Sequence, residues 1–256
     1  MIVSHEGSAL GQDRAGLSLI FAGGTRPRAA DIVRLADAHA EGAGGFAVSH
    51  RPAEREGWLE LLSSGLAFDL GGLAPAESAP LPQQIHRYGF PSPEEAFAVE
   101  AIRLAPGSHL AAGAHLLPIV RTMCALAARM ARLPGIGAVA WHPARTAIEP
   151  ELFVRSIDAW LSGGAFPALG LVALTDTPEG GLASEGLAFF VGQELLIDPA
   201  AGLSSRDSAR LAIRLINLIV AEGPQRIARD FTALDGEPLS AKPSPDGRLL
   251  RIGRAG

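Results

Sequence analysis

Histidine and aromatic side chains in two distant segments are the strongest candidates for a functional site. The candidate ligand-binding residues are His86, Arg87, Tyr88, Trp141, His142 and Glu194. Imidazole groups transfer protons and bind metals near neutral pH, and irregular loops and strand ends are where such side chains commonly act. A metal or acid–base site formed by His86, His142 and Glu194 is therefore one hypothesis. Separate surface or capping roles for these three residues are the simpler interpretation.

Neither the spacing of the histidines nor the single cysteine matches a known metal-binding pattern, and no cofactor is predicted. The seven histidines are dispersed, without an H-E-x-x-H pattern or a closely spaced pair. Cys124 lies in the apolar face of a predicted helix, which indicates a buried structural thiol rather than a nucleophile. A G-x-S-x-G sequence is also absent, so a standard α/β-hydrolase site has no support.

Two further segments have residue types that suit anion binding. Two glycines and Thr25 precede a predicted helix, and helix N-termini bind anions through their unpaired backbone N–H groups. Arg206, Arg210 and Arg214 form the polar stripe of a long predicted helix. We favour a tight turn with Thr25 as helix cap for the first segment. For the second we favour a solvent-facing stripe.

Apolar runs and helical periodicity predict the elements that position these residues. Strands are expected at 17–22, 46–49, 66–70, 136–141, 169–174, 181–191 and 194–198, with short strands near 238–240 and 249–252. Helices are expected after Pro27 and at 54–62, 93–104, 108–133, 150–161 and 204–222. Residues 75–93 contain five prolines and are expected to form a long surface connection, because proline interrupts helices and strand ladders.

The order of these elements predicts an α+β fold. Strands and helices follow a split β-α-β order, as in ferredoxin-like β-α-β-β-α-β folds. The second part of the chain gives the same order again if it shares the strand at 136–141. We therefore expect a two-layer α/β sandwich with a mostly antiparallel or mixed sheet. The expected organisation is a single domain over 1–256, with two pseudo-repeated halves at about 15–142 and 136–252.

Composition excludes several classes of protein. The chain has 256 residues, of which 48% are hydrophobic, and a net charge of −5. The hydrophobic content excludes a disordered chain, and the negative charge disfavours a nucleic-acid partner. The first residues lack the basic start and apolar run of a signal peptide. The longest charge-free runs are too short to span a membrane. We expect a bacterial cytoplasmic protein with no membrane partner.

The C-terminal half carries a series of features that occur together in one known family. They are a strand that ends in Trp141, a helix with Phe153 and Trp160, the segment GLAFFVGQE at 186–194, and a tail with PSPDGRLLRI. Over about residues 136–252 the chain thus resembles a bacterial domain of unknown function, the family numbered four-two-six-one. The resemblance implies an uncharacterised protein and supplies no catalytic residue.

Two functions remain open at the level of the sequence. Since no complete catalytic constellation is present, we favour a non-enzymatic module that binds a protein or a small ligand. The alternative is an enzyme, hydrolase-like or metal-assisted, with a site near the proline-rich connection and His142. The identity of the ligand or partner and the oligomeric state are not indicated.

Overall fold

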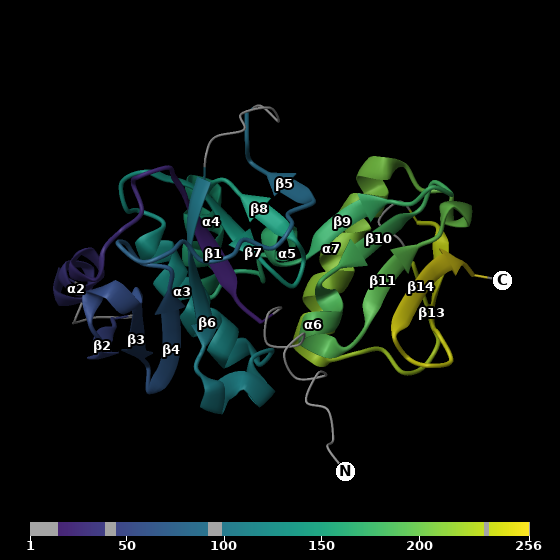
Figure 1. Ribbon diagram of the computed structural model, residues 1–256. Helices are drawn as coiled ribbons and strands as arrows, with labels where there is room; N and C mark the ends of the chain where they lie inside the picture. Colours follow the sequence, from purple (N-terminus) through teal and green to yellow (C-terminus); the bar gives the residue numbers. More distant parts are fainter. Residues whose placement is uncertain (1–14, 39–44, 92–98, 233–235, 256) are drawn as a thin grey trace, which may run out of the picture. The chain divides into compact units, whose positions relative to one another are not determined.

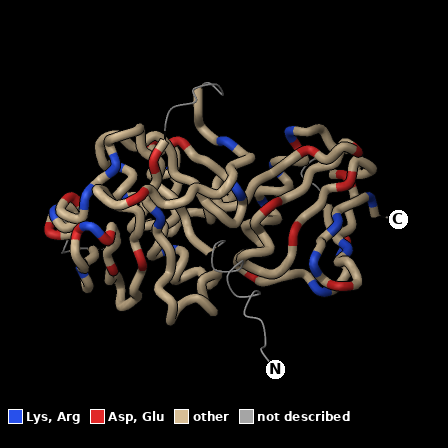
Figure 2. Tube along the Cα trace, viewed as in Figure 1, with Lys and Arg blue, Asp and Glu red and all other residues tan. Residues whose placement is uncertain are grey.

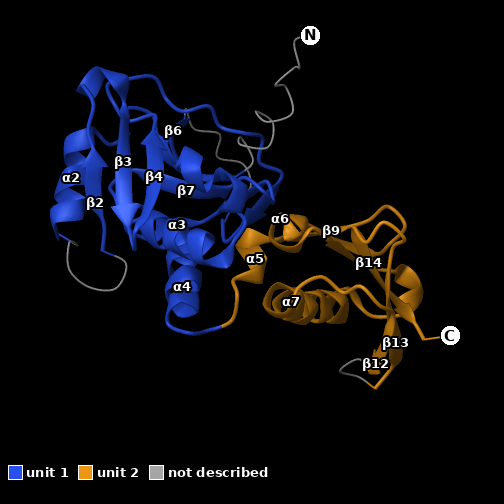
Figure 3. Cartoon of the chain, turned by 90° about the horizontal axis from the view of Figure 1, so that it is seen from below, with its two compact units in different colours: residues 1–164 blue, residues 165–256 orange. Residues whose placement is uncertain are grey.

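The chain folds into two compact units, Met1–Gly164 and Ala165–Gly256 (Figure 3). The computed structural model describes residues 15–38, 45–91, 99–232 and 236–255. Each unit combines helices with a sheet, which confirms the predicted α+β sandwich. The unit boundary differs from that of the expected halves, because the strand at 136–141 belongs wholly to the first unit. The single domain with repeated halves stays a prediction.

Unit 1 has an eight-stranded sheet among its described residues (Figure 1). In sheet order the strands are β2 (Ala47–His50), β3 (Trp58–Ser63), β4 (Leu66–Gly71), β6 (Val99–Pro106), β1 (Leu17–Ala22), β7 (Ile136–Trp141), β8 (Thr146–Ile148) and β5 (His86–Tyr88). Neighbouring strands are antiparallel except β8 and β5, which are parallel. Strand β1 is central because Leu17, Leu19 and Phe21 are fully buried.

In the described part of unit 1, three helices and two 3-10 turns accompany the sheet. They are α2 (Ala29–Ala38), α3 (Leu117–Met130), α4 (Pro150–Leu161), η1 (Glu54–Glu56) and η2 (Ser108–Gly113). Pro118 lies in the first turn of α3, where the missing N–H costs no hydrogen bond. Val120, Met123 and Leu126 on its apolar face are fully buried. This face fixes the rotation of α3 and directs the opposite, polar face outward.

The proline-rich connection has a packing role that its composition did not reveal. Its Leu81 and Phe90 pack against Ile20, Ala138 and Ala140 of β1 and β7. Because side chains alternate along a strand, Ile20 points to the opposite sheet face from Leu19 and Phe21. The connection therefore covers part of the second face of the sheet. It is irregular as predicted, apart from β5.

Unit 2 has a mixed six-stranded sheet among its described residues. In sheet order the strands are β12 (Arg229–Thr232), β13 (Pro238–Pro243), β14 (Leu249–Arg254), β11 (Glu194–Ile197), β10 (Leu182–Glu185) and β9 (Ala173–Asp176). The pair β11 and β14 is parallel, and the other pairs are antiparallel. Its helices are α5 (Ala168–Leu171), α6 (Leu187–Val191) and α7 (Ser205–Glu222), with a 3-10 turn, η3 (Pro199–Ala201). Ser204 caps the N-terminus of α7, since its Oγ accepts from Asp207 N.

Two of the predicted helices are wrong. The segment 54–62 forms η1 and then β3, in which Leu59 and Leu61 are buried and alternate with less buried neighbours. That period of two belongs to a strand, although clustered leucines also suit a helix. Residues 99–104 of the predicted helix 93–104 lie in β6, which pairs with both β1 and β4. Residues 93–98 lie outside the described residues.

Two of the predicted strands are also partly wrong. The run 181–191 breaks at Gly186, whose φ of 96° ends β10 and starts α6. Glycine adopts this left-handed conformation without a steric penalty. In the run 169–174, residues up to Leu171 belong to α5, and the strand begins at Ala173.

Candidate functional site

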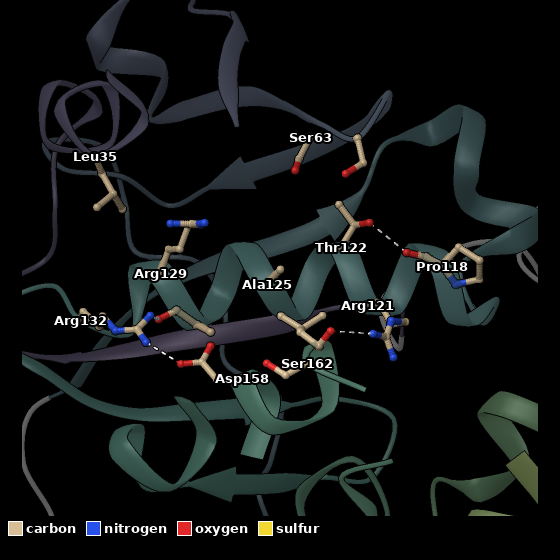
Figure 4. Close-up of a pocket in the computed structure, with 13 residues that line it drawn as sticks. Leu35, Ser63, Pro118, Arg121, Thr122, Ala125, Arg129, Arg132, Asp158 and Ser162 are labelled. Atoms are coloured by element: carbon tan, nitrogen blue, oxygen red, sulfur yellow. Dashed lines mark hydrogen bonds and ion pairs between the residues drawn. The ribbon is translucent and has the colours of Figure 1, made fainter. Parts of the chain in front are cut away.

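A groove of about 1010 Å³ opens on unit 1 beside α3 (Figure 4). Its lining comes from α3 and the turn after it, α4, the turn between β3 and β4, and Leu35 of α2. Three guanidinium groups lie along it, those of Arg121, Arg129 and Arg132. Asp158 is the one carboxylate among the lining residues that the structure describes, so these residues together carry a net charge of +2. The whole chain, by contrast, has a net charge of −5, and its charged residues are dispersed (Figure 2).

The amphipathic pattern of α3 places the arginines in this groove. Arg121, Ala125 and Arg129 recur at intervals of four residues, which puts them on one face of a helix. The opposite face is occupied by buried residues such as Met123 and Ala127. Ala125 between the two arginines is small and lines the groove without filling it. The groove thus has a shallow apolar floor between two cationic groups.

Arg121 is held in place by the C-terminal end of α4. Its Nη2 donates to the carbonyl oxygens of Trp160, at 3.2 Å, and Leu161, at 3.3 Å. Its guanidinium carbon lies 4.6 Å from the centroid of the Trp160 ring. The last carbonyl groups of a helix lack intrahelical partners, and Arg121 donates to two of them, although Trp160 O also accepts from Gly163 N. These contacts also order a long side chain before any ligand arrives, which lowers the entropic cost of binding.

Arg132 and Asp158 form the pair at one end of the groove. Arg132 Nη2 donates to Asp158 Oδ2 at 2.8 Å, and Nη1 donates to the Ala128 carbonyl at 2.9 Å. Both side chains are about half exposed, at 53% and 52%. Arg129 extends from α3 toward the wall formed by Leu35 (Figure 4). The charge of Arg132 is thus locally balanced by Asp158.

The opposite wall is the two-residue turn that joins β3 to β4. Ser64 and Gly65 both have positive φ, 51° and 74°, as a type I′ hairpin turn requires. Ser63 is buried and donates to the Gly45 carbonyl at 2.8 Å, whereas Ser64 is exposed. The wall therefore adds a hydroxyl group to the groove but no charge.

The lining is suited to binding rather than to proton transfer. Among the described residues that form it there is no histidine, cysteine, glutamate, lysine or tyrosine. Arginine stays protonated in proteins, and the carboxylate of Asp158 already accepts from Arg132. Guanidinium groups bind carboxylates and phosphates through paired N–H donors. The arrangement can recognise an anion, but it offers no general base near neutral pH.

The structure brings five of the six predicted site residues to one edge of the unit 1 sheet. His86, Arg87 and Tyr88 form β5, and His86 is in register with Thr146 of β8. On the other side of β8, Thr146 is in register with Trp141. The backbone N–H groups of Arg145 and His86 then donate to the His142 and Arg145 carbonyls. Segments more than 50 residues apart thus meet at this edge.

His142 is buried at this edge and contacts Ser18. Its Nε2 lies 2.9 Å from Ser18 Oγ, and the two residues are 4% and 0% exposed. A nucleophilic serine must be reached by its substrate, and Ser18 has no exposed surface. The hydrogen bond therefore links β1 to the residue after β7. The enzyme site proposed near His142 stays a prediction.

Glu194 lies in unit 2 and caps α6. Its carboxylate accepts from Ser184 Oγ, from Gly186 N at 2.9 Å and from Ala188 N at 3.0 Å. Burial raises the pKa of Glu194, and these hydrogen bonds oppose the shift. The carboxylate satisfies backbone donors at the start of a helix, which is a structural role. A joint site with His86 and His142 stays a prediction.

The two segments considered for anion binding are occupied or solvent-facing. The backbone N–H of Gly24 donates to Glu100 Oε2 at 2.9 Å, so the chain supplies its own anion there. Arg206, Arg210 and Arg214 are exposed on α7, and Arg210 pairs with Asp207 at 3.7 Å. Within the described ranges, no group of three His, Cys, Asp or Glu side chains is placed to hold a metal ion. None of the helices described has the length and hydrophobicity that crossing a bilayer demands.

Cys124 is expected to react with thiol reagents only after unfolding. The residue is fully buried, and burial raises the pKa of its thiol to about 12, so thiolate is scarce at pH 8. Labelling with 5,5′-dithiobis(2-nitrobenzoate) should be at least about 100-fold slower in the native protein than in denaturant, because only the thiolate reacts. Rapid stoichiometric labelling of the native protein would contradict this burial.

No protein-family model, curated protein or solved structure matches the chain. The resemblance of the C-terminal half to the family of unknown function therefore stays a prediction. Function has to be inferred from the geometry of the site.

The groove is the feature that sequence reasoning missed. The sequence signal that was available is the spacing of Arg121, Arg129 and Arg132 within the helix predicted at 108–133. Asp158 and the Ser63–Ser64 wall come from elements distant in sequence. A helix was wrongly predicted at 54–62, so the sequence did not indicate the β3–β4 hairpin whose turn forms this wall.

Proposed function

We propose that the protein is a non-catalytic binding module whose groove on unit 1 takes an anionic ligand. One observation carries this proposal: the described lining residues supply three guanidinium groups and a single carboxylate, which already accepts from Arg132. Such a surface supplies charge and directed hydrogen bonds without a proton donor or acceptor for chemistry.

The surroundings of the reactive side chains support a non-catalytic role. Cys124 is fully buried with a raised pKa, and Ser18 is fully buried against His142. Glu194 is engaged with backbone donors of unit 2. Each of these groups has a structural use, and none of them lines the groove.

The finer predictions from the sequence belong to the same proposal. We propose a ferredoxin-like core in unit 1, supported by the sheet order β4-β6-β1-β7 with antiparallel neighbours. We also propose a bacterial, cytoplasmic protein, and the presence of only one cysteine in the sequence supports this location.

A binding panel tests the proposed function. Fluorescein-labelled decaglutamate is titrated with the full chain at low salt, with citrate and pyrophosphate as competitors. We expect saturable binding that weakens as salt rises, and recovery of every ligand unchanged after incubation. Failure of all three anions to bind, or consumption of one of them, would overturn the proposal.

A further inference from the structure

We propose that a second copy of this chain pairs with strand β12 of unit 2, so that the two sheets join edge to edge. The pairing is antiparallel and places Phe231 opposite Phe231 of the second copy. This interaction surface goes beyond the groove and does not depend on it. The proposal rests on the edge position of β12, on the direction of its backbone groups and on the residues that each register would place opposite one another.

Strand β12 lies at one edge of the unit 2 sheet among the described strands (Figure 3). Its four residues pair with β13 in an unbroken register. Phe231 is half-buried, and the other three residues are exposed. A strand at an edge offers unpaired N–H and C=O groups to another chain. Strand β2, at an edge of the unit 1 sheet, differs because its register is irregular between Val48 and His50, and such bulges blunt an edge.

One backbone hydrogen bond fixes which groups of β12 point outward. The Pro238 carbonyl accepts from the residue that follows β14, at 3.1 Å, so the backbone groups of Pro238 face β14. These directions alternate along a strand, so the groups of Leu239 face β12. Leu239 is in register with Phe231, whose backbone groups therefore face β13. The N–H and C=O groups of Asp230 and Thr232 point to the open side, where the described part of the chain gives them no partner.

The side chains of β12 select one register for antiparallel pairing with a second copy. Residues that lie opposite each other in such a pair turn their backbone groups alike. Two registers meet this condition over three residues of each β12, one centred on Asp230 and one on Phe231. The first places two aspartates directly opposite each other, and like charges in that position are destabilising. The second places Phe231 opposite its own copy and Asp230 opposite Thr232.

The register centred on Phe231 satisfies the open backbone groups. Asp230 of each copy exchanges hydrogen bonds with Thr232 of the other, and the Phe231 side chains meet where paired strands bring side chains closest. The two Asp230 side chains stand diagonally on the opposite sheet face, about 7–8 Å apart, where exposed charges repel weakly. Such a contact belongs to the transient class that buries less than about 1,200 Å² in total. We therefore expect a weak dimer that forms at high protein concentration.

Disulfide trapping in the full chain tests the pairing and its register. Phe231→Cys places two introduced thiols opposite each other, at a separation that a disulfide can bridge. Under mild oxidation we expect a linked dimer to form at least about tenfold faster than with Arg229→Cys or Asp230→Cys. The native Cys124 is fully buried and does not compete. Equal or faster linkage at either of the other two positions would overturn the proposal.

Sedimentation equilibrium of the wild-type chain and of two Asp230 variants is the second test. Asp230→Pro removes an outward N–H group and none that faces β13, and an edge strand tolerates proline at such a position. Asp230→Ala keeps the N–H group and is the matched control. We expect the wild-type chain and Asp230→Ala to dimerise as concentration rises, and Asp230→Pro to do so at least about tenfold more weakly.

Two results of this second test would contradict the pairing. One is a wild-type chain that stays monomeric up to millimolar concentration, as it would if the edge took a strand from a different protein. The other is a dimer that Asp230→Pro leaves unchanged. The wild-type measurement does not depend on the folding of a variant, and neither result bears on anion binding by the groove.

Discussion

Reversal of the charge of Arg129 to glutamate is expected to weaken decaglutamate binding by about 100-fold or more. Hydrogen bonds to charged groups contribute about 1.5–3 kcal/mol, which corresponds to roughly 10- to 150-fold in affinity. The added carboxylate also cancels the net positive charge of the lining, because the groove would then hold two arginines and two acids. Arg129 lies on the partly exposed face of α3, so the fold should tolerate this change.

Arg155→Glu is the matched control for this charge reversal. It makes the same change in net charge on unit 1, but Arg155 is 68% exposed on α4 and does not line the groove. Anisotropy titrations of both variants at several salt concentrations give the comparison. If Arg155→Glu weakened binding as much as Arg129→Glu, the attraction would be a property of total charge and the groove would have no special role.

Truncation of Glu194 to alanine is expected to destabilise unit 2 by about 3 kcal/mol. The carboxylate accepts from Ser184 Oγ and from the backbone N–H groups of Gly186 and Ala188. Removal of an acceptor leaves a buried donor unsatisfied, at a cost of about 1–3 kcal/mol for each group. Urea unfolding monitored by hydrogen exchange at residues of β10 and α6 would measure the loss.

Glu194→Gln separates the cap from the charge. Glutamine keeps one acceptor oxygen in nearly the same volume, so we expect it to lose about half as much stability as alanine. Equal destabilisation by both variants would show that charge, rather than the hydrogen bonds at Gly186 and Ala188, accounts for the effect. No change in either variant would contradict the capping role of Glu194.

Local pattern was sufficient to predict the elements whose periodicity is unbroken. Strand β1, strand β7 and helix α7 lie where the sequence placed them, because each has a continuous apolar run or a clean helical face. Helix α3 covers only Leu117–Met130 of the helix expected at 108–133, and η2 forms at the start of that range. The segments 54–62 and 99–104 were assigned to helices, since their leucines and alanines suit both periods. Pairing with β4 and β1 decides between the two structures, and that pairing is not local.

The candidate site was predictable only in part, for the same reason. The positions of Arg121 and Arg129 on one face of a helix follow from their spacing. The groove itself requires α4 and the β3–β4 turn to lie beside that face, which no local pattern encodes. Glu194 was a candidate site residue from the sequence, but the structure gives it a structural role. Its carboxylate accepts from backbone donors that the turn at Gly186 brings close.

The central claim is that the groove beside α3 is where an anion binds, and amide NMR tests it most directly. Titration of the isotopically labelled full chain with decaglutamate reports the residues that the ligand contacts. We expect the largest shifts at the guanidinium Nε–H of Arg121 and Arg129 and at the backbone amides of Ser64 and Ala125. Largest shifts at His86, Tyr88 and His142, or within unit 2, with the α3 signals unchanged, would contradict the claim.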